Sequence, residues 1–239
     1  IKHSAYLLQT MQLQTPSYIL LKGTDKVLFF WIPLFTRKGG LNHRRLGKVY
    51  VFLMWIVVGT AALLSIKNVL IGHFIQATFL GFLALITGNV LWSGIAVLRN
   101  KEGLSMGFLA IQRTLDFSVF LFGLVLVIYG IGLRGQGTGV LMLIFGILGL
   151  SDFPKVRAHL QGERSTTVNW FDEHLDGMIT SGIAAYTAFF VFGGRQFFEG
   201  WLSGYWAIIP WVAPTVIGLI AMKYVKAHYA ARQTAKTLE

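Results

Sequence analysis

The chain has 239 residues and a formal net charge of +11, and 54% of its residues are hydrophobic. A mean hydropathy of +0.61, with several apolar runs near the length that a bilayer requires, excludes a soluble protein and predicts an integral membrane protein. The basic residues fall in short loops between these runs rather than along one face or tail, so they indicate membrane topology, and no nucleic-acid partner is expected.

Seven segments are predicted to cross the membrane. The first, over residues 16–35, is interrupted by Lys22, Asp25 and Lys26, so that only residues 27–35 are cleanly apolar. Six further runs cover residues 49–65, 74–98, 115–133, 137–150, 178–192 and 206–225. These runs are continuous rather than alternating, and backbone groups in lipid leave helices as the alternative to a β-barrel. The predicted fold is therefore all-α, a polytopic transmembrane helical bundle of about seven spans in a single domain over residues 1–239.

Lysine and arginine are concentrated in every second loop. Arg37, Lys38 and three further cations lie between the first two predicted spans, whereas the next loop has only Lys67. The same alternation continues to the C-terminal end. Short cation-rich loops stay in the cytoplasm, so the sequence predicts a cytoplasmic C-terminus and an N-terminus outside.

Ionisable residues gather near the predicted cytoplasmic ends of the spans. They are His43, Arg44, Arg45, Arg113, Asp116, Asp152, Asp172, Glu173, His174 and Asp176. Because residues three or four apart share a helix face, Arg113 is expected to reach Asp116, and Asp172 to flank Asp176. Ionisable groups at membrane depth are costly and usually face the bundle interior or water, which makes this set the candidate functional site.

A structural role is the competing interpretation of the same residues. Those from Asp172 to Asp176 open a predicted helix, where the helix dipole favours acidic groups by about 0.3 to 1 kcal/mol each. Ion pairs between helices, such as Asp116 with Arg44 or Arg45, would likewise hold helices together without any chemistry.

Two further roles stay open for this set. His43 and His174 are predicted at similar depth on different helices, where their imidazoles would be able to ligate haem b. Asp25 in the first span, or Asp116, would serve a proton or small-solute path in a transporter. The histidines and carboxylates lack the spacing of a metal-binding helix, so no metal site is predicted.

Several recognisable catalytic motifs are absent from the sequence. It has no Walker-type phosphate-binding loop, no His-Glu-X-X-His metalloprotease helix and no cysteine. Its 27 glycines include pairs such as Gly146 and Gly149, which favour close packing of helices. These features favour a non-enzymatic role, as a membrane subunit or accessory protein that associates with other membrane protein subunits.

Three segments carry a resemblance to a family. Residues 35–50, which include Phe35-Thr-Arg-Lys-Gly-Gly and His43-Arg-Arg-Leu-Gly-Lys-Val-Tyr50, are joined by a second block over residues 170–189 and a third over residues 210–218. Together they resemble a family of bacterial predicted membrane proteins classed as a domain of unknown function. The resemblance implies a helical bundle in the bacterial inner membrane, with His43 and His174 at the family's recurrent histidines, and it implies no known reaction. The first span departs from the family pattern, because it has polar residues where an apolar helix opened by a histidine is expected.

Overall fold

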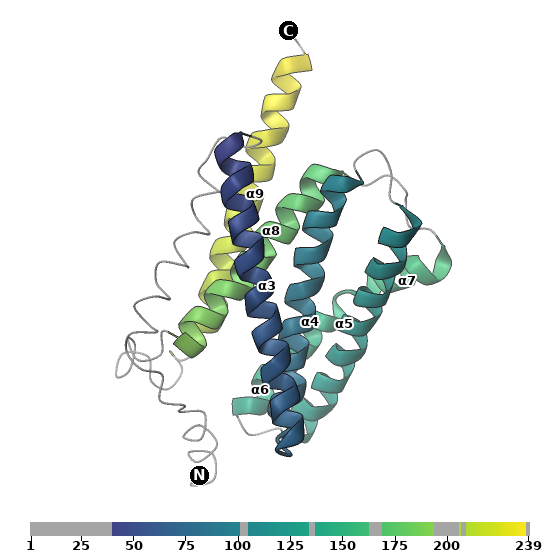
Figure 1. Ribbon diagram of the computed structural model, residues 1–239, viewed down its shortest axis with the longest axis vertical. Helices are drawn as coiled ribbons and strands as arrows, with labels where there is room; N and C mark the ends of the chain where they lie inside the picture. The colour runs from purple at the N-terminus through teal and green to yellow at the C-terminus, as the bar shows by residue number, and fades with distance from the viewer. Residues whose placement is uncertain are drawn as a thin grey trace. The chain divides into compact units, whose positions relative to one another are not determined.

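The computed structural model describes residues 40–100, 105–133, 137–162, 169–193, 206 and 209–237. Helices dominate these residues and no strand occurs among them, so the predicted all-α class is confirmed (Figure 1). The predicted first span and its residues Asp25 and Lys26 lie outside the described part of the chain.

Most helices are longer than the predicted apolar runs. In chain order they are α3 (Leu41–Leu70), α4 (Phe74–Ala96), the 3-10 turn η1 (Val97–Arg99), α5 (Met106–Gly132), α6 (Gly137–Leu150), α7 (Phe153–Gln161), α8 (Trp170–Ala188), the π-helical turn η2 (Phe189–Gly193) and α9 (Ile209–Thr237). The extensions consist mainly of polar turns, which an apolar run alone does not include. The first two turns of α8, for example, hold Asp172, Glu173 and Asp176.

Four of the described helical segments are long and apolar enough to cross a membrane. They are Leu41–Leu70, Phe74–Arg99, Met106–Gly132 and Thr138–Gln161. At 1.5 Å per residue, the 27 residues of the third of these extend about 40 Å, more than the roughly 30 Å of a bilayer's hydrocarbon core. The chain therefore has the build of a membrane protein, while the count of seven spans and the orientation of the termini stay predictions.

Contacts divide the chain into two compact units. The first consists of Ile1–Tyr50 and Ala185–Thr215, and the second of Val51–Ala184 and Val216–Glu239. In the described part of the first unit, the end of α8 runs into η2, and the ring centroids of Tyr186 and Phe190 lie 6.3 Å apart. The prediction of a single domain stays a prediction.

The core of the second unit lies among α4, α5 and α6. Phe82, Val119, Leu126 and Met142 form a buried apolar cluster there. Between α5 and α6 the backbones touch, because a Cβ atom built on Gly123 would lie 2.9 Å from the Cα of Gly149. The expected role of glycine in close helix packing is borne out at this crossing.

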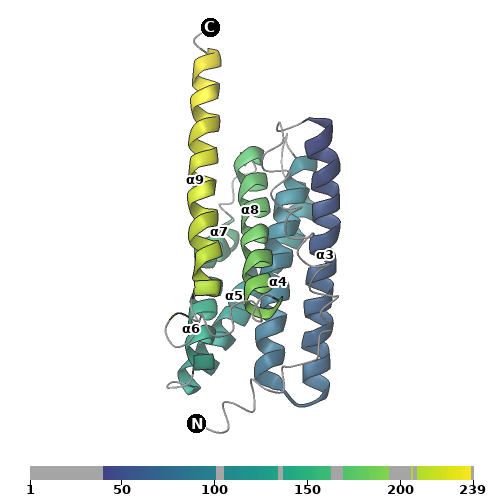
Figure 2. The ribbon, with the colours of Figure 1, turned by 90° about the vertical axis from the view of Figure 1, so that its left-hand side faces the viewer.

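Two further helices, α3 and α8, contact α4 in this unit. α4 lies alongside the C-terminal part of α3, to which it is joined by a tight turn at Gly72 with a φ of +79° (Figure 2). A second close crossing joins α4 to α8, where a Cβ on Gly177 would lie 2.6 Å from the carbonyl oxygen of Val90.

The helix α7 was not expected from the sequence, where residues 153–161 fall between two predicted spans. Pro154 stands in its first turn, where a missing N–H costs no hydrogen bond. At its other end, Gly162 takes a left-handed conformation, with a φ of +66°, and its N–H donates to the carbonyl oxygen of Ala158. These start and stop signals delimit a short amphipathic helix, which a search for long apolar runs overlooks.

Candidate functional site

Four buried polar side chains from three helices form one hydrogen-bonded group, which we term the Asp116 network. Its members are Asn89, Gln112, Asp116 and His159, and none is more than 5% exposed. Asp116 itself is fully buried. A carboxyl group enclosed at this depth, between helices of membrane length, marks the most unusual chemical environment among the described residues.

Each oxygen of Asp116 has its own set of partners. Oδ1 accepts hydrogen bonds from Asn89 Nδ2 at 3.0 Å and from Gln112 Nε2 at 2.9 Å. The same Gln112 nitrogen also donates to Asn89 Oδ1 at 2.7 Å, so the two amides and the carboxyl group close a ring. Oδ2 faces a different group, with His159 Nε2 only 2.8 Å away.

The chain positions these residues by simple helical geometry. Gln112 and Asp116 are four residues apart on α5 and therefore share one face, while Asn89 comes from α4. His159 lies in the last turn of α7, where its side chain is buried. The predicted partner of Asp116, Arg113, is exposed on α5 and so lies in different surroundings from the buried carboxyl group.

The electrostatics of the network centre on the contact between Asp116 and His159. An isolated charge buried away from water is very costly, whereas a paired and hydrogen-bonded charge is tolerated. The amides of Asn89 and Gln112 both donate to Oδ1 of the carboxyl group. Oδ2 and Nε2 are within hydrogen-bond distance, and the tautomer of His159 decides which of the two atoms donates.

One acceptor in the network has no hydrogen-bond partner among the described residues. Gln112 Oε1 is buried, although both hydrogens of the same amide are used. An unsatisfied buried acceptor costs roughly 1–3 kcal/mol, so the group is retained at an energetic disadvantage. A bound water or hydroxyl donor would remove this penalty.

A second charged group lies near the start of α7. Lys155 Nζ is 2.7 Å from Asp152 Oδ1, and the lysine side chain is 53% exposed whereas the aspartate is 15% exposed. Lys155 is also within electrostatic reach of Asp116 and Glu173. Asp152 of the predicted cluster therefore has a lysine of α7 as its ion-pair partner.

On α8, each predicted site residue with a described contact has a partner of its own. Asp172 Oδ2 accepts from Asn169 at 2.8 Å, and Asp176 binds Lys226 of α9, whose Nζ is 2.8 and 2.7 Å from the two carboxyl oxygens. His174 Nδ1 is 2.7 Å from the carbonyl oxygen of Gly94 on α4. Local helix geometry and helix-to-helix contacts account for these interactions.

The remaining predicted residues, His43, Arg44 and Arg45, stand in the first turns of α3, in the first unit. Both arginines are exposed. His174 belongs to the second unit, and its ring nitrogen Nδ1 is engaged by a backbone oxygen. Haem binding by His43 and His174 stays a prediction. Within the described ranges, no group of three or more histidine, aspartate or glutamate residues is arranged to hold a metal ion.

Sequence reasoning found Asp116 but missed its three partners. Asn89 and Gln112 carried a usable signal, because Asn89 is an amide inside a strongly apolar run and Gln112 precedes Asp116 by one helical turn. His159 carried none, since it stands in a polar stretch 43 residues away from Asp116.

Comparison with known proteins adds no relative to this description. No family model, curated protein or solved structure matches the chain. The resemblance to the family of bacterial membrane proteins therefore stays a prediction, and functional inference depends on the geometry of the site.

Proposed function

We propose that this protein is a multi-pass membrane transport protein in which Asp116 and His159 bind a proton. The observation that carries the proposal is the 2.8 Å contact between a fully buried carboxyl group and a buried imidazole, among helices of membrane length. Ionisable residues at membrane depth are costly and commonly line proton or solute pathways.

The two oxygens of the Asp116 carboxyl group have different partners, and this difference supports a proton-binding role. Because two amide donors hold Oδ1, the group keeps its orientation whether or not Oδ2 is protonated. A proton arriving at the network would join the Oδ2–Nε2 contact and convert a carboxylate beside a neutral imidazole into a carboxylate beside an imidazolium. Release of the proton restores the first state, so the step is balanced without any further reactant.

A polar connection toward the surface supports the same proposal. α7 carries buried His159 near its end and half-exposed Lys155 near its start. Lys155 interacts electrostatically with Asp116 and pairs with Asp152. Protons exchanging with solvent at Asp152 would thus have charged groups between the surface and the network.

The division between α6 and α7 is a further supporting feature. A segment of membrane length, Thr138–Gln161, is interrupted at Ser151 and Asp152, and the second part carries His159. Interrupted helices are recurrent at the binding sites of transporters, where a short half-helix can move against the rest of the bundle.

Proton flux into proteoliposomes tests the proposal. Purified protein reconstituted with an internal pH-sensitive dye should acidify or alkalise the lumen under an imposed potential, and Asp116→Asn should abolish this flux. Thr114→Val is the matched control, because Thr114 is an exposed residue of the same helix that donates only along α5, to Ala110. Absence of flux in the wild type, or its persistence in Asp116→Asn, would contradict the proposal.

A spectroscopic measurement covers the case in which Asp116→Asn reconstitutes poorly. The infrared difference spectrum between acidic and alkaline buffer should contain imidazole ring bands that disappear in His159→Gln. Unchanged difference bands in a folded His159→Gln variant would show that the network does not titrate.

The predicted role as a membrane subunit is a second candidate, favoured by the surface of α3. Only 11% of the residues in the most apolar stretch of 18 residues of α3 are buried. The corresponding stretch of α4 and η1 is 56% buried. Phe52, Leu63 and Ile66 are among the exposed apolar side chains of α3. Extraction in mild detergent followed by native mass spectrometry should then recover a complex with another membrane protein, and a lone monomer would contradict this role.

A further inference from the structure

An elongated apolar groove runs between α3, α4 and α5 in the second unit, on faces that do not take part in the Asp116 network. Its volume is about 540 Å³. On α5 it is lined by Ile111 and Leu115, whereas the adjacent residues Gln112 and Asp116 belong to the network. The groove is thus a separate feature, and the inference below does not rest on the proposed transport function.

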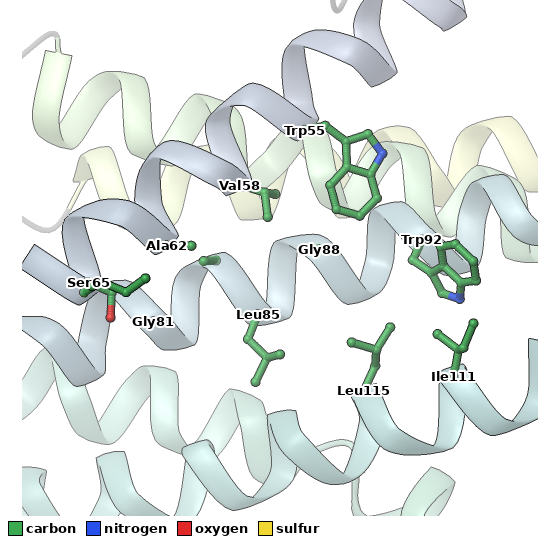
Figure 3. Close-up of a pocket in the computed structure, with 12 residues that line it drawn as sticks. Trp55, Val58, Ala62, Ser65, Gly81, Leu85, Gly88, Trp92, Ile111 and Leu115 are labelled. Atoms are coloured by element: carbon green, nitrogen blue, oxygen red, sulfur yellow. The ribbon is translucent and has the colours of Figure 1, made fainter.

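The groove narrows toward one end. Near that end, Ser65 of α3 donates to the carbonyl oxygen of Ala77 at 2.7 Å, and a Cβ on Gly81 would lie 3.0 Å from the Ser65 hydroxyl. Toward the other end α3 and α4 diverge, and Trp55 and Trp92 flank the opening (Figure 3). The ten residue steps from Trp55 to Ser65 give the groove a length of about 15 Å along the helix axis.

Small residues keep the groove open between these ends. Ala62 on α3 and Gly88 on α4 face it, and a Cβ on Gly88 would meet only Val58, at an ordinary 3.5 Å. The lining has no ionisable side chain, and its volume is within the range of about 300–1,000 Å³ typical of ligand pockets. A narrow, apolar and unbranched ligand suits this shape.

We propose that this groove binds one acyl chain of a phospholipid, with the polar end of the lipid at Trp55 and Trp92. The three lining helices are all of membrane length, so their apolar surfaces are suited to contact lipid hydrocarbon. Tryptophan is enriched where headgroups and hydrocarbon meet. Arg99, which is exposed seven residues beyond Trp92, supplies a positive charge on the same end of α4 for the phosphate.

Lipid retention by purified protein tests this site. Protein stripped of lipid in detergent and then supplied with phosphatidylglycerol should hold one lipid per chain in native mass spectra. Ala62→Leu combined with Gly88→Leu fills the groove and should weaken this retention roughly tenfold or more. The matched control is Gly59→Leu combined with Ala61→Leu, which adds the same side chains on α3 outside the lining and should retain the lipid.

Photocrosslinking distinguishes the groove from the general lipid-facing surface. A phosphatidylglycerol with a diazirine at the end of its acyl chain should label peptides containing Ser65 and Gly81, at the narrow end. Equal labelling along all exposed apolar faces would overturn the proposal, as would equal lipid retention by the groove-filling and control variants.

The natural absence of cysteine makes one competing occupant easy to examine. Ala62→Cys, combined in turn with single cysteine substitutions over residues 27–35, would form a disulfide if that segment of the chain filled the groove. Efficient crosslinking, together with no bound lipid, would show that the occupant is the chain itself. Absence of the crosslink with lipid bound is the expected result.

Discussion

His159 and Asp116 are separated by 43 residues in the sequence, yet His159 Nε2 and Asp116 Oδ2 lie 2.8 Å apart in an interior from which both side chains are almost completely shielded. The contact brings α7 to α5, and the amides of Asn89 and Gln112 complete it from the other oxygen. The stability of the Asp116 network is sensitive to the loss of any one of its four side chains, because each removal leaves a buried polar atom without a hydrogen bond.

Asn89→Leu is expected to destabilise the protein by roughly 1–3 kcal/mol. The substitution keeps the branching and the number of side-chain heavy atoms but removes one donor from Asp116 Oδ1 and the acceptor of one Gln112 hydrogen bond. Thermal unfolding in detergent measures the effect. Gln76→Leu, an equivalent change on the same helix at a partly exposed position outside the network, serves as the control. Equal melting temperatures for the two variants would contradict the importance assigned to the network.

The sequence was sufficient to predict the all-helical class and to place Asp116 among ten candidate site residues. It was not sufficient for the partners of Asp116, because α4 and α5 are apolar on almost all faces, so their sequences do not show which residues of the two helices meet. Arg113 was favoured as a partner on spacing alone, yet its charge is better solvated where it is, exposed on α5. The contact of His159 with Asp116 depends on the break after α6 and on the packing of α7 against α5, which belong to the tertiary fold.

Gly123→Ala is expected to destabilise the packing of α5 on α6 by about 1–3 kcal/mol. The added Cβ would lie 2.9 Å from the Cα of Gly149 and 3.0 Å from the carbonyl oxygen of Gly146, and backbone atoms cannot move aside as a flexible side chain can. Gly107→Ala on the same helix has nothing within 4 Å of its Cβ and should be neutral or stabilising by up to about 1 kcal/mol. Melting temperatures compare the two, and an equal response would show that the helices separate without cost.

Between α8 and α9, the aromatic stack should contribute at least as much to stability as the ion pair. The rings of Phe171 and Tyr229 are parallel within 13° and 3.7 Å apart, a type of contact worth about 0.5–1.5 kcal/mol. Asp176 and Lys226 are 42% and 34% exposed, so that water screens their attraction to roughly 0.2–1 kcal/mol. Two double-mutant cycles measure these couplings, with the ionic one falling in high salt. An ionic coupling that exceeds the aromatic one and ignores salt would refute this ranking.

The left-handed residue at the end of α7 should control the position of His159. Gly162→Ala places a Cβ at a φ of +66° and is expected to cost about 1–2 kcal/mol, whereas asparagine, which tolerates this conformation, should cost less. Because His159 is three residues away, the strain should loosen the last turn of α7, increase amide hydrogen exchange there and reduce the proton flux proposed above. Gly72→Ala is a matched control, since Gly72 has a comparable φ of +79° in the turn between α3 and α4, outside the network. It should lower the melting temperature to a similar extent while leaving exchange in α7 unchanged. If both variants altered α7 equally, or neither did, the end of this helix would not be what holds the imidazole against Asp116.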